Sequence, residues 1–187
     1  MRVPEEDQMK MMRFRFLLLF LCALPVLAQA KPSNDLIVRG RYLATVGGCG
    51  DCHTPKTASM EPDSTRLLSG SPSNAPAPSK PNKADEVVSS AGSTAFHGPW
   101  GISYAANLTP DRDTGIAREY TEASFIQALR TGKTPDGGSI LPPMPWQNYA
   151  KMTDDDLKAM WAYLQSLKPV KNKVKPPVRA AGARKAG

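Results

Sequence analysis

The stretch "GGCGDCHTPK", residues 47–56, carries two cysteines three positions apart and a histidine directly after the second. Cys49, Cys52 and His53 thus bring two thiols and an imidazole into five consecutive residues. The chemistry open to two thiols depends on the compartment, because disulfides persist in oxidising surroundings and are rare in the cytosol. The N-terminus is therefore the first context in which this stretch has to be interpreted.

Residues 1–30 have the pattern of a signal peptide. Basic residues precede an apolar run at 16–28, and Ala28-Gln29-Ala30 has the small-x-small pattern of a cleavage site. An uncleaved membrane anchor is the alternative, but the run is shorter than the ~20 apolar residues that span a membrane, and Pro25 interrupts it. We therefore expect an exported, periplasmic protein.

The mature chain would keep two of the three cysteines, because cleavage removes Cys22. A disulfide scaffold normally carries four or more cysteines, so the sequence does not fit that class. The residues that remain suit one domain of the usual ~100–200 residues.

The charge of the chain is unevenly distributed. The whole sequence has 24 basic and 17 acidic residues, a formal net charge of +7, and residues 168–187 hold seven of the basic residues and no acidic one. Like charges and prolines favour extended chain, so residues 171–187 are expected to form a basic flexible tail. Such a tail could dock on an acidic protein or a membrane surface, or could merely aid solubility. No nucleic-acid partner is expected.

Capping residues and hydrophobic periodicity predict three helices, at 35–47, 122–131 and 154–167. Residues 57–93 are rich in proline and serine and predict a long surface loop inserted in the domain. No segment alternates with a period of two. The expected fold class is therefore mostly α, with long irregular loops, over residues 31–170.

The residues Cys49-Gly50-Asp51-Cys52-His53 match C-x-x-C-H, the pattern that attaches a c-type haem. The two intervening residues place the thiols for addition to the two haem vinyl groups, and His53 then falls under the iron as an axial ligand. A thioredoxin-like pair would need no histidine and would sit beside a βαβ pattern. A zinc site would need four ligands, and His97 is the only other histidine. A structural disulfide would leave His53 without a role.

Met144 is the favoured second axial ligand. It lies in "ILPPMPWQNY", residues 140–149, where three prolines predict a stiff, extended, non-helical path. Such a loop can hold a thioether toward the iron on the side opposite His53.

Other candidates for this ligand are simpler to explain otherwise. Met60 lies too close to the attachment turn, Met152 starts a helix, and Met160 is on the apolar stripe of the last helix. His97, in "FHGPWG", is a rival ligand, although a solvated imidazole on a buried loop is the simpler interpretation.

These motifs resemble those of the class I c-type cytochromes, and more closely those of bacterial monohaem domains that act as partners or subunits of periplasmic dehydrogenases. The resemblance is carried by "RGRYLATVGGCGDCHTP" (39–55), "GPWGISYAANLTPDRDTGI" (98–116), "FIQALRTGK" (125–133) and "ILPPMPWQNYAKMTDDDLKAMWAYLQSLKPV" (140–170). It implies a few helices around one covalently attached haem c, with Cys49 and Cys52 as attachment residues and His53 and Met144 as axial ligands. It also implies that the first and last helices cross, with Gly40 near an aromatic residue such as Tyr163. By resemblance alone, the candidates for approaching the haem propionates are Trp100, Tyr104, Asn107 and Arg130.

The function that this resemblance implies is a periplasmic electron carrier rather than an enzyme. A dehydrogenase would be the expected donor and a terminal oxidase a candidate acceptor. The alternative is a haem enzyme or a ligand-binding sensor, which would need a displaceable sixth ligand.

Overall fold

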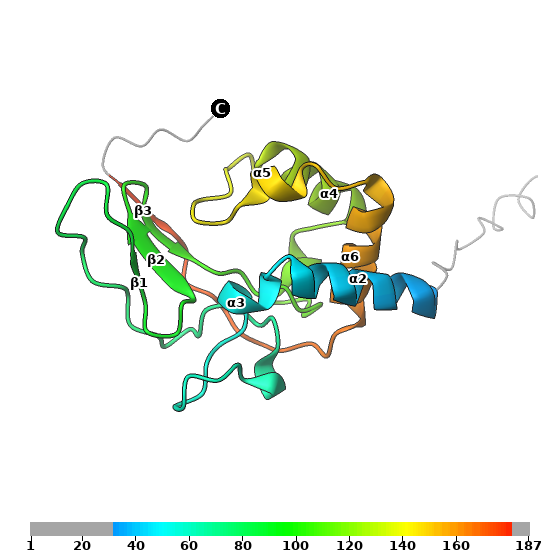
Figure 1. Cartoon of the computed structure of the whole chain (residues 1–187), viewed down its shortest axis with the longest axis horizontal. Coiled ribbons are helices and arrows are strands. Elements are labelled where there is room, and N and C mark those ends of the chain that lie inside the picture. The colour runs from blue at the N-terminus through cyan, green and yellow to red at the C-terminus, as the bar shows by residue number, and fades with distance from the viewer. Residues whose placement is uncertain (1–31, 181–187) are drawn as a thin grey trace, which may run out of the picture. The chain divides into compact units, whose positions relative to one another are not determined.

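The computed structural model describes residues 32–180 (Figure 1). The predicted signal peptide and residues 181–187 lie outside the described residues. The helices are α2 (Asn34–Val46), α3 (Cys49–His53), α4 (Glu122–Thr131), α5 (Trp146–Tyr149) and α6 (Asp154–Ser166), with short 3-10 turns η1 (Ser64–Arg66) and η2 (Ile116–Arg118). The strands are β1 (Val88–Ser89), β2 (Ala95–Gly98), β3 (Gly101–Tyr104) and β4 (Val178–Arg179). Within residues 32–180, no helix is long and apolar enough to cross a membrane.

The three predicted helices are confirmed as α2, α4 and α6, and each begins at a side chain that caps it. Ser33 Oγ accepts a hydrogen bond from the Leu36 N–H at the start of α2. Thr121 and Ser124 form a reciprocal capping box at the start of α4. Thr153 Oγ1 accepts from the Asp156 N–H at the start of α6, where three aspartates also favour the positive end of the helix dipole.

The expected crossing of the first and last helices is confirmed. Gly40 of α2 lies directly against α6: a Cβ at this position would fall 1.8 Å from the Ala159 carbonyl oxygen and 2.8 Å from Tyr163 Cβ. Arg39 reinforces the contact through an ion pair to Asp156, with Nη2 2.9 Å from Oδ1. Only glycine allows the two backbones to approach this closely.

A small antiparallel sheet was not expected. Its strands run in the order β1-β2-β3-β4, and β2 and β3 form a hairpin in which Gly98 pairs with Gly101 (Figure 1). The stretch "FHGPWG" is therefore part of a hairpin rather than of an irregular buried loop. The strands are two to four residues long, and β2 has buried residues at both ends with half-buried ones between, so no two-residue period was visible in the sequence.

The prediction of a surface loop at 57–93 is wrong for part of its length. Leu68, Ser69 and Ser71 are at most 2 % exposed, and Leu68 belongs to the main hydrophobic core. The Leu68 carbonyl accepts from the Leu108 N–H, and the Gly70 N–H donates to the His53 carbonyl. This part of the segment therefore supports the C-x-x-C-H turn, while η1 and β1 lie elsewhere along the same segment.

The expected flexible tail also needs correction over residues 171–180. Asn172 is 5 % exposed, and its side-chain amide donates to the carbonyls of Ser69 and Ser71. Further on, β4 pairs with β3 and lies alongside the hairpin of β2 and β3 (Figure 1). Gly101 has φ +100°, and a Cβ there would meet the Val178 carbonyl oxygen at 2.0 Å, so this pairing requires glycine.

Candidate functional site

One cavity of about 660 Å³ brings residues from most of the helices together with the C-terminal segment. Its size lies within the ~300–1,000 Å³ typical of small-molecule and cofactor sites. Side chains from α3, α4, α5 and α6 contribute much of its apolar surface: Cys49, Phe125, Ala128, Leu129, Tyr149, Met160 and Leu164. We call this space the main cavity.

The two cysteines sit on α3, a single helical turn that begins after a glycine in the left-handed region, Gly48 with φ 69°. Cys49 is 8 % exposed and lines the main cavity, whereas Cys52 is half-buried and is not among its lining residues. Tyr149 fixes the entry to this turn, because its hydroxyl donates to the Gly47 carbonyl at 2.5 Å. No disulfide joins the two cysteines.

Burial favours the protonated form of both thiols. It raises the pKa of the Cys49 thiol to about 11 and also raises the pKa of Cys52, with the Asp51 carboxylate adding to the rise at Cys52. A buried neutral thiol is a poor free nucleophile. The raised pKa of the two thiols differs from the lowered thiol pKa on which a redox-active C-x-x-C pair depends.

His53 is held in one orientation. Its Nδ1 lies 2.8 Å from the Ala106 carbonyl oxygen, and a carbonyl can only accept, so Nδ1 carries the proton of this bond. Burial lowers the pKa of His53, although the bond to Ala106 acts in the opposite direction. The neutral ring then keeps a lone pair on Nε2, which is the requirement for a metal ligand whose other nitrogen is fixed by a carbonyl.

Met144 and Met160 both line the main cavity. Met160, on α6, is 3 % exposed and belongs to the hydrophobic core, as the sequence predicted. Met144 is half-buried on the loop before α5 and packs against the same core. The predicted non-helical path holds at Met144 itself, but it ends earlier than expected because Trp146–Tyr149 form α5.

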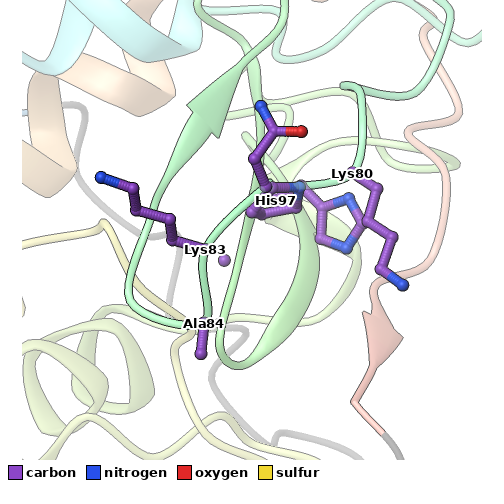
Figure 2. A pocket seen from close by; sticks show the side chains of 7 residues that line it. Lys80, Lys83, Ala84 and His97 are labelled. Carbon is purple, nitrogen blue, oxygen red and sulfur yellow. The ribbon is translucent and has the colours of Figure 1, made fainter.

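His97 lies away from the main cavity. It lines a separate, smaller cavity of about 290 Å³ with Lys80, Lys83 and Ala84, and the two cavities share no lining residue (Figure 2). Its Nδ1 is 3.1 Å from the Ser79 carbonyl oxygen. This placement supports the simpler interpretation of His97 as a surface imidazole.

The four side chains suggested by resemblance divide into two groups. Tyr104 and Asn107 line the main cavity, whereas Trp100 and Arg130 are not among its lining residues. Trp100 donates to Ser103 Oγ at 3.2 Å, and Arg130 holds Asp154 Oδ1 at 2.6 Å and also donates to the Ala150 carbonyl.

The buried amide of Asn107 is committed to the chain itself. It donates to the Val170 carbonyl at 2.8 Å, and its oxygen accepts from the Thr109 N–H and hydroxyl. Asn107 thus braces the cavity wall.

The sequence interpretation missed the C-terminal part of this wall. Residues Lys173–Pro177 and Arg179 line the main cavity, although the sequence predicted a flexible tail there. Asn172 was the available signal, because an isolated amide among basic residues and prolines is a candidate for a buried anchor.

The residues that line the main cavity fit a covalently bound haem. A buried cysteine, an oriented neutral histidine and two thioethers meet in one largely apolar space of suitable volume. Imidazole and thioether are the donor types that hold haem iron in c-type proteins. The half-buried Cys52 lies on the same helical turn as Cys49, three residues further along the chain.

Comparisons with known proteins point in the same direction. Residues 37–168 match the family described as Cytochrome c. The chain is 34 % identical over 152 residues to the cytochrome c subunit of a quinone-type alcohol dehydrogenase from Gluconobacter oxydans, covering 80 % of this chain and 26 % of that protein. It is 33 % identical over 142 residues to the fructose dehydrogenase cytochrome subunit of Gluconobacter japonicus, covering 75 % and 23 % respectively.

A third relative is the gluconate 2-dehydrogenase cytochrome c subunit of Pantoea cypripedii, with 32 % identity over 137 residues, which cover 73 % of this chain and 24 % of that protein. The chain thus spans about a quarter of the length of these three relatives.

Proposed function

Because the chain belongs to the cytochrome c family, we propose that it is a periplasmic electron carrier with one covalently bound haem c. The observation that carries this proposal is the main cavity, which Cys49, His53 and Met144 all line. Haem supplies a single iron that alternates between the ferric and ferrous states. A single C-x-x-C-H in the sequence supports one haem.

The roles of the site residues follow from their positions. Cys49 and Cys52 provide the two thiols for attachment, and α3 presents them one helical turn apart. His53 offers Nε2 as one axial ligand because Ala106 occupies Nδ1. Met144 is the proposed second ligand, on a loop that packs against the core without being part of a helix. Methionine ligation and an apolar surrounding both raise the reduction potential, which suits an electron carrier.

The partners proposed for this chain are redox proteins. The relatives' names describe cytochrome subunits of dehydrogenases, so a dehydrogenase is the proposed donor, with a terminal oxidase as a candidate acceptor. The signal-peptide pattern of residues 1–30 supports export to the periplasm, where such partners would meet the chain. The basic residues of 168–187 would favour an acidic protein surface or anionic lipid heads.

The test is to express the full chain with a periplasmic haem-attachment system and to examine the purified protein. Denaturing electrophoresis with haem staining should show colour at the mature mass, and Cys49→Ala or Cys52→Ala should weaken or abolish it. A potentiometric titration should give a single one-electron step, and carbon monoxide should not bind the reduced protein readily. Haem that extracts fully into acid-acetone would contradict covalent attachment, and rapid carbon monoxide binding would favour the enzyme or sensor alternative.

A further inference from the structure

The C-terminal segment, residues 170–180, is part of the cofactor cavity even though the family match ends at residue 168. Lys173–Pro177 and Arg179 line the main cavity together with Cys49 and His53. This wall is therefore a feature of this chain that the family pattern does not describe.

The segment is fixed in place by hydrogen bonds on both sides of its cavity-lining part. The Asn172 amide donates to the Ser69 carbonyl at 2.7 Å and the Ser71 carbonyl at 2.9 Å, and the Asn172 N–H donates to Thr114 Oγ1 at 3.0 Å. At the far end, β4 pairs with β3, and the Ala180 N–H donates to the Trp100 carbonyl at 3.0 Å. The backbone between these anchors is therefore held along the cavity wall.

The cavity wall carries more positive than negative charge. Four basic side chains line it, namely Arg118, Lys173, Lys175 and Arg179, against two acidic ones, Glu119 and Asp136. Two of the four cations are already committed, because Arg118 donates to the Asp113 carbonyl at 3.2 Å and Lys175 to the Ala75 carbonyl at 2.5 Å.

The other two basic residues of the cavity wall, Arg179 and Lys173, are not held by such hydrogen bonds in the described part of the chain. Within residues 32–180, neither Arg179 nor Lys173 has a side-chain hydrogen bond or ion pair to another residue. Arg179 is half-buried, and its Nη2 lies 3.8 Å from the point where a Cβ of Gly138 would be. The nearby Asp136 carboxylate accepts from Thr134 Oγ1 at 2.5 Å and the Gly138 N–H at 3.3 Å, within its own turn.

Arg179 is a half-buried guanidinium on a largely apolar cavity and has no ion pair within residues 32–180, so an anionic group on the occupant of the cavity would stabilise it. We propose that Arg179, assisted by the more exposed Lys173, binds a propionate carboxylate of the haem. This inference rests on the proposed function, because haem is the occupant that brings carboxylates into the main cavity. Arginine suits the role because its planar fork matches a carboxylate with two hydrogen bonds.

The consequence for electron transfer is electrostatic. An unpaired carboxylate near the iron stabilises the ferric state, and a cation beside it offsets that charge. Arg179 and Lys173 therefore raise the reduction potential. They act as positioning and charge-balancing residues, since neither ligates the iron.

The experiment compares midpoint potentials of the purified haem protein at low ionic strength, where screening is weakest. Arg179→Gln should shift the potential downward, the double variant with Lys173→Gln should shift it further, and Arg179→Lys should restore part of the wild-type value. Arg112→Gln is the matched control, because it removes the same charge from an exposed position that does not line the main cavity. Resonance Raman spectra should show a changed propionate bending mode in Arg179→Gln but not in Arg112→Gln.

A potential and a propionate mode in Arg179→Gln identical to those of Arg112→Gln would overturn the assignment. That result would leave the proposed function intact if the variant still stains for haem and titrates as a one-electron carrier. Failure of haem staining in the wild type would instead contradict the proposed function itself. If Arg179→Gln does not accumulate as a haem protein, Arg179→Lys decides: a propionate mode shifted from that of the wild type supports the pairing, because lysine cannot supply the two-hydrogen-bond fork, and a mode identical to those of the wild type and Arg112→Gln overturns it.

Discussion

Two methionines line the main cavity, and we expect them to have different roles. Met144 is the proposed iron ligand, whereas Met160 packs in the hydrophobic core. If Met144 is the sixth ligand, as proposed, Met144→Ala should lower the reduction potential, abolish the weak far-red sulfur-to-iron band and open the iron to cyanide. Met160→Ala should leave that band in place and cost about 2–5 kcal/mol of unfolding free energy, because Met160 is 3 % exposed within the core. Optical spectra and thermal unfolding of the two variants check both expectations.

The converse result, with the band lost in Met160→Ala and kept in Met144→Ala, would transfer the ligand role to α6. Met144 and Met160 line the same cavity, so each variant serves as the control for the other.

The proposed attachment residues and the proposed histidine ligand could be recognised in the sequence because they lie close together along the chain. Cys49, Cys52 and His53 share one helical turn, so their spacing alone defines their chemistry. The partner of the His53 ring, the Ala106 carbonyl, could not be predicted, because any residue type can offer a backbone oxygen. Arg179 was missed for a related reason: it reaches the main cavity only through the pairing of β4 with β3.

Secondary-structure elements were predictable to the extent that their signals were local. The helices carry their own caps in the sequence, at Ser33, Thr121 and Thr153, and all three helices were predicted. The strands are too short to show a period, and β4 follows Pro176 and Pro177, which favoured an extended tail. Strand β4 forms because it pairs with β3, and no signal in its own local sequence predicts it.

The crossing of α2 and α6 leads to a prediction about Gly40. In an isolated helix, Gly40→Ala would stabilise by about 0.5–1 kcal/mol, because alanine is the better helix former. Here the new Cβ would lie 1.8 Å from the Ala159 carbonyl oxygen, so the helices must move apart. We expect a net destabilisation of about 1–3 kcal/mol, measured by denaturant unfolding.

Gly92→Ala is the control for this variant. A Cβ there would meet nothing closer than Lys56 Cγ at 3.9 Å, and the backbone does not need a positive φ. Gly92→Ala should therefore leave stability nearly unchanged. Equal stability of Gly40→Ala and wild type would mean that α2 and α6 do not depend on this close contact.

Over the whole molecule, the seven basic residues of 168–187 do not form one functional unit. Five of them, Lys168, Lys171, Lys173, Lys175 and Arg179, belong to described chain, and three of these line the main cavity. Arg184 and Lys185 lie outside the described residues. The predicted basic flexible tail therefore consists of two parts with different expected roles. One part is a wall of the main cavity, and the other is the basic pair Arg184 and Lys185.

Two truncations distinguish these parts. Ending the chain after Ala180 removes residues 181–187, the terminal pair among them, and keeps the hydrogen bonds of Asn172 and the pairing of β4 with β3, so the haem spectrum, the reduction potential and the melting temperature should match those of the full chain. Ending it after Leu167 removes Asn172 and β4. The buried Ser69 and Ser71 carbonyls and the Asn107 amide then lose partners, at about 1–3 kcal/mol for each group left unsatisfied.

The longer truncation should therefore melt at a lower temperature, have a lower reduction potential and bind cyanide at the ferric iron faster, because one wall of the main cavity is gone. Circular dichroism, potentiometry and cyanide-binding rates on the three proteins measure these effects. If the protein ending at Leu167 matches the full chain in all three, residues 170–180 do not shield the haem. If the protein ending at Ala180 already shows the losses, the stabilising contacts extend into residues 181–187.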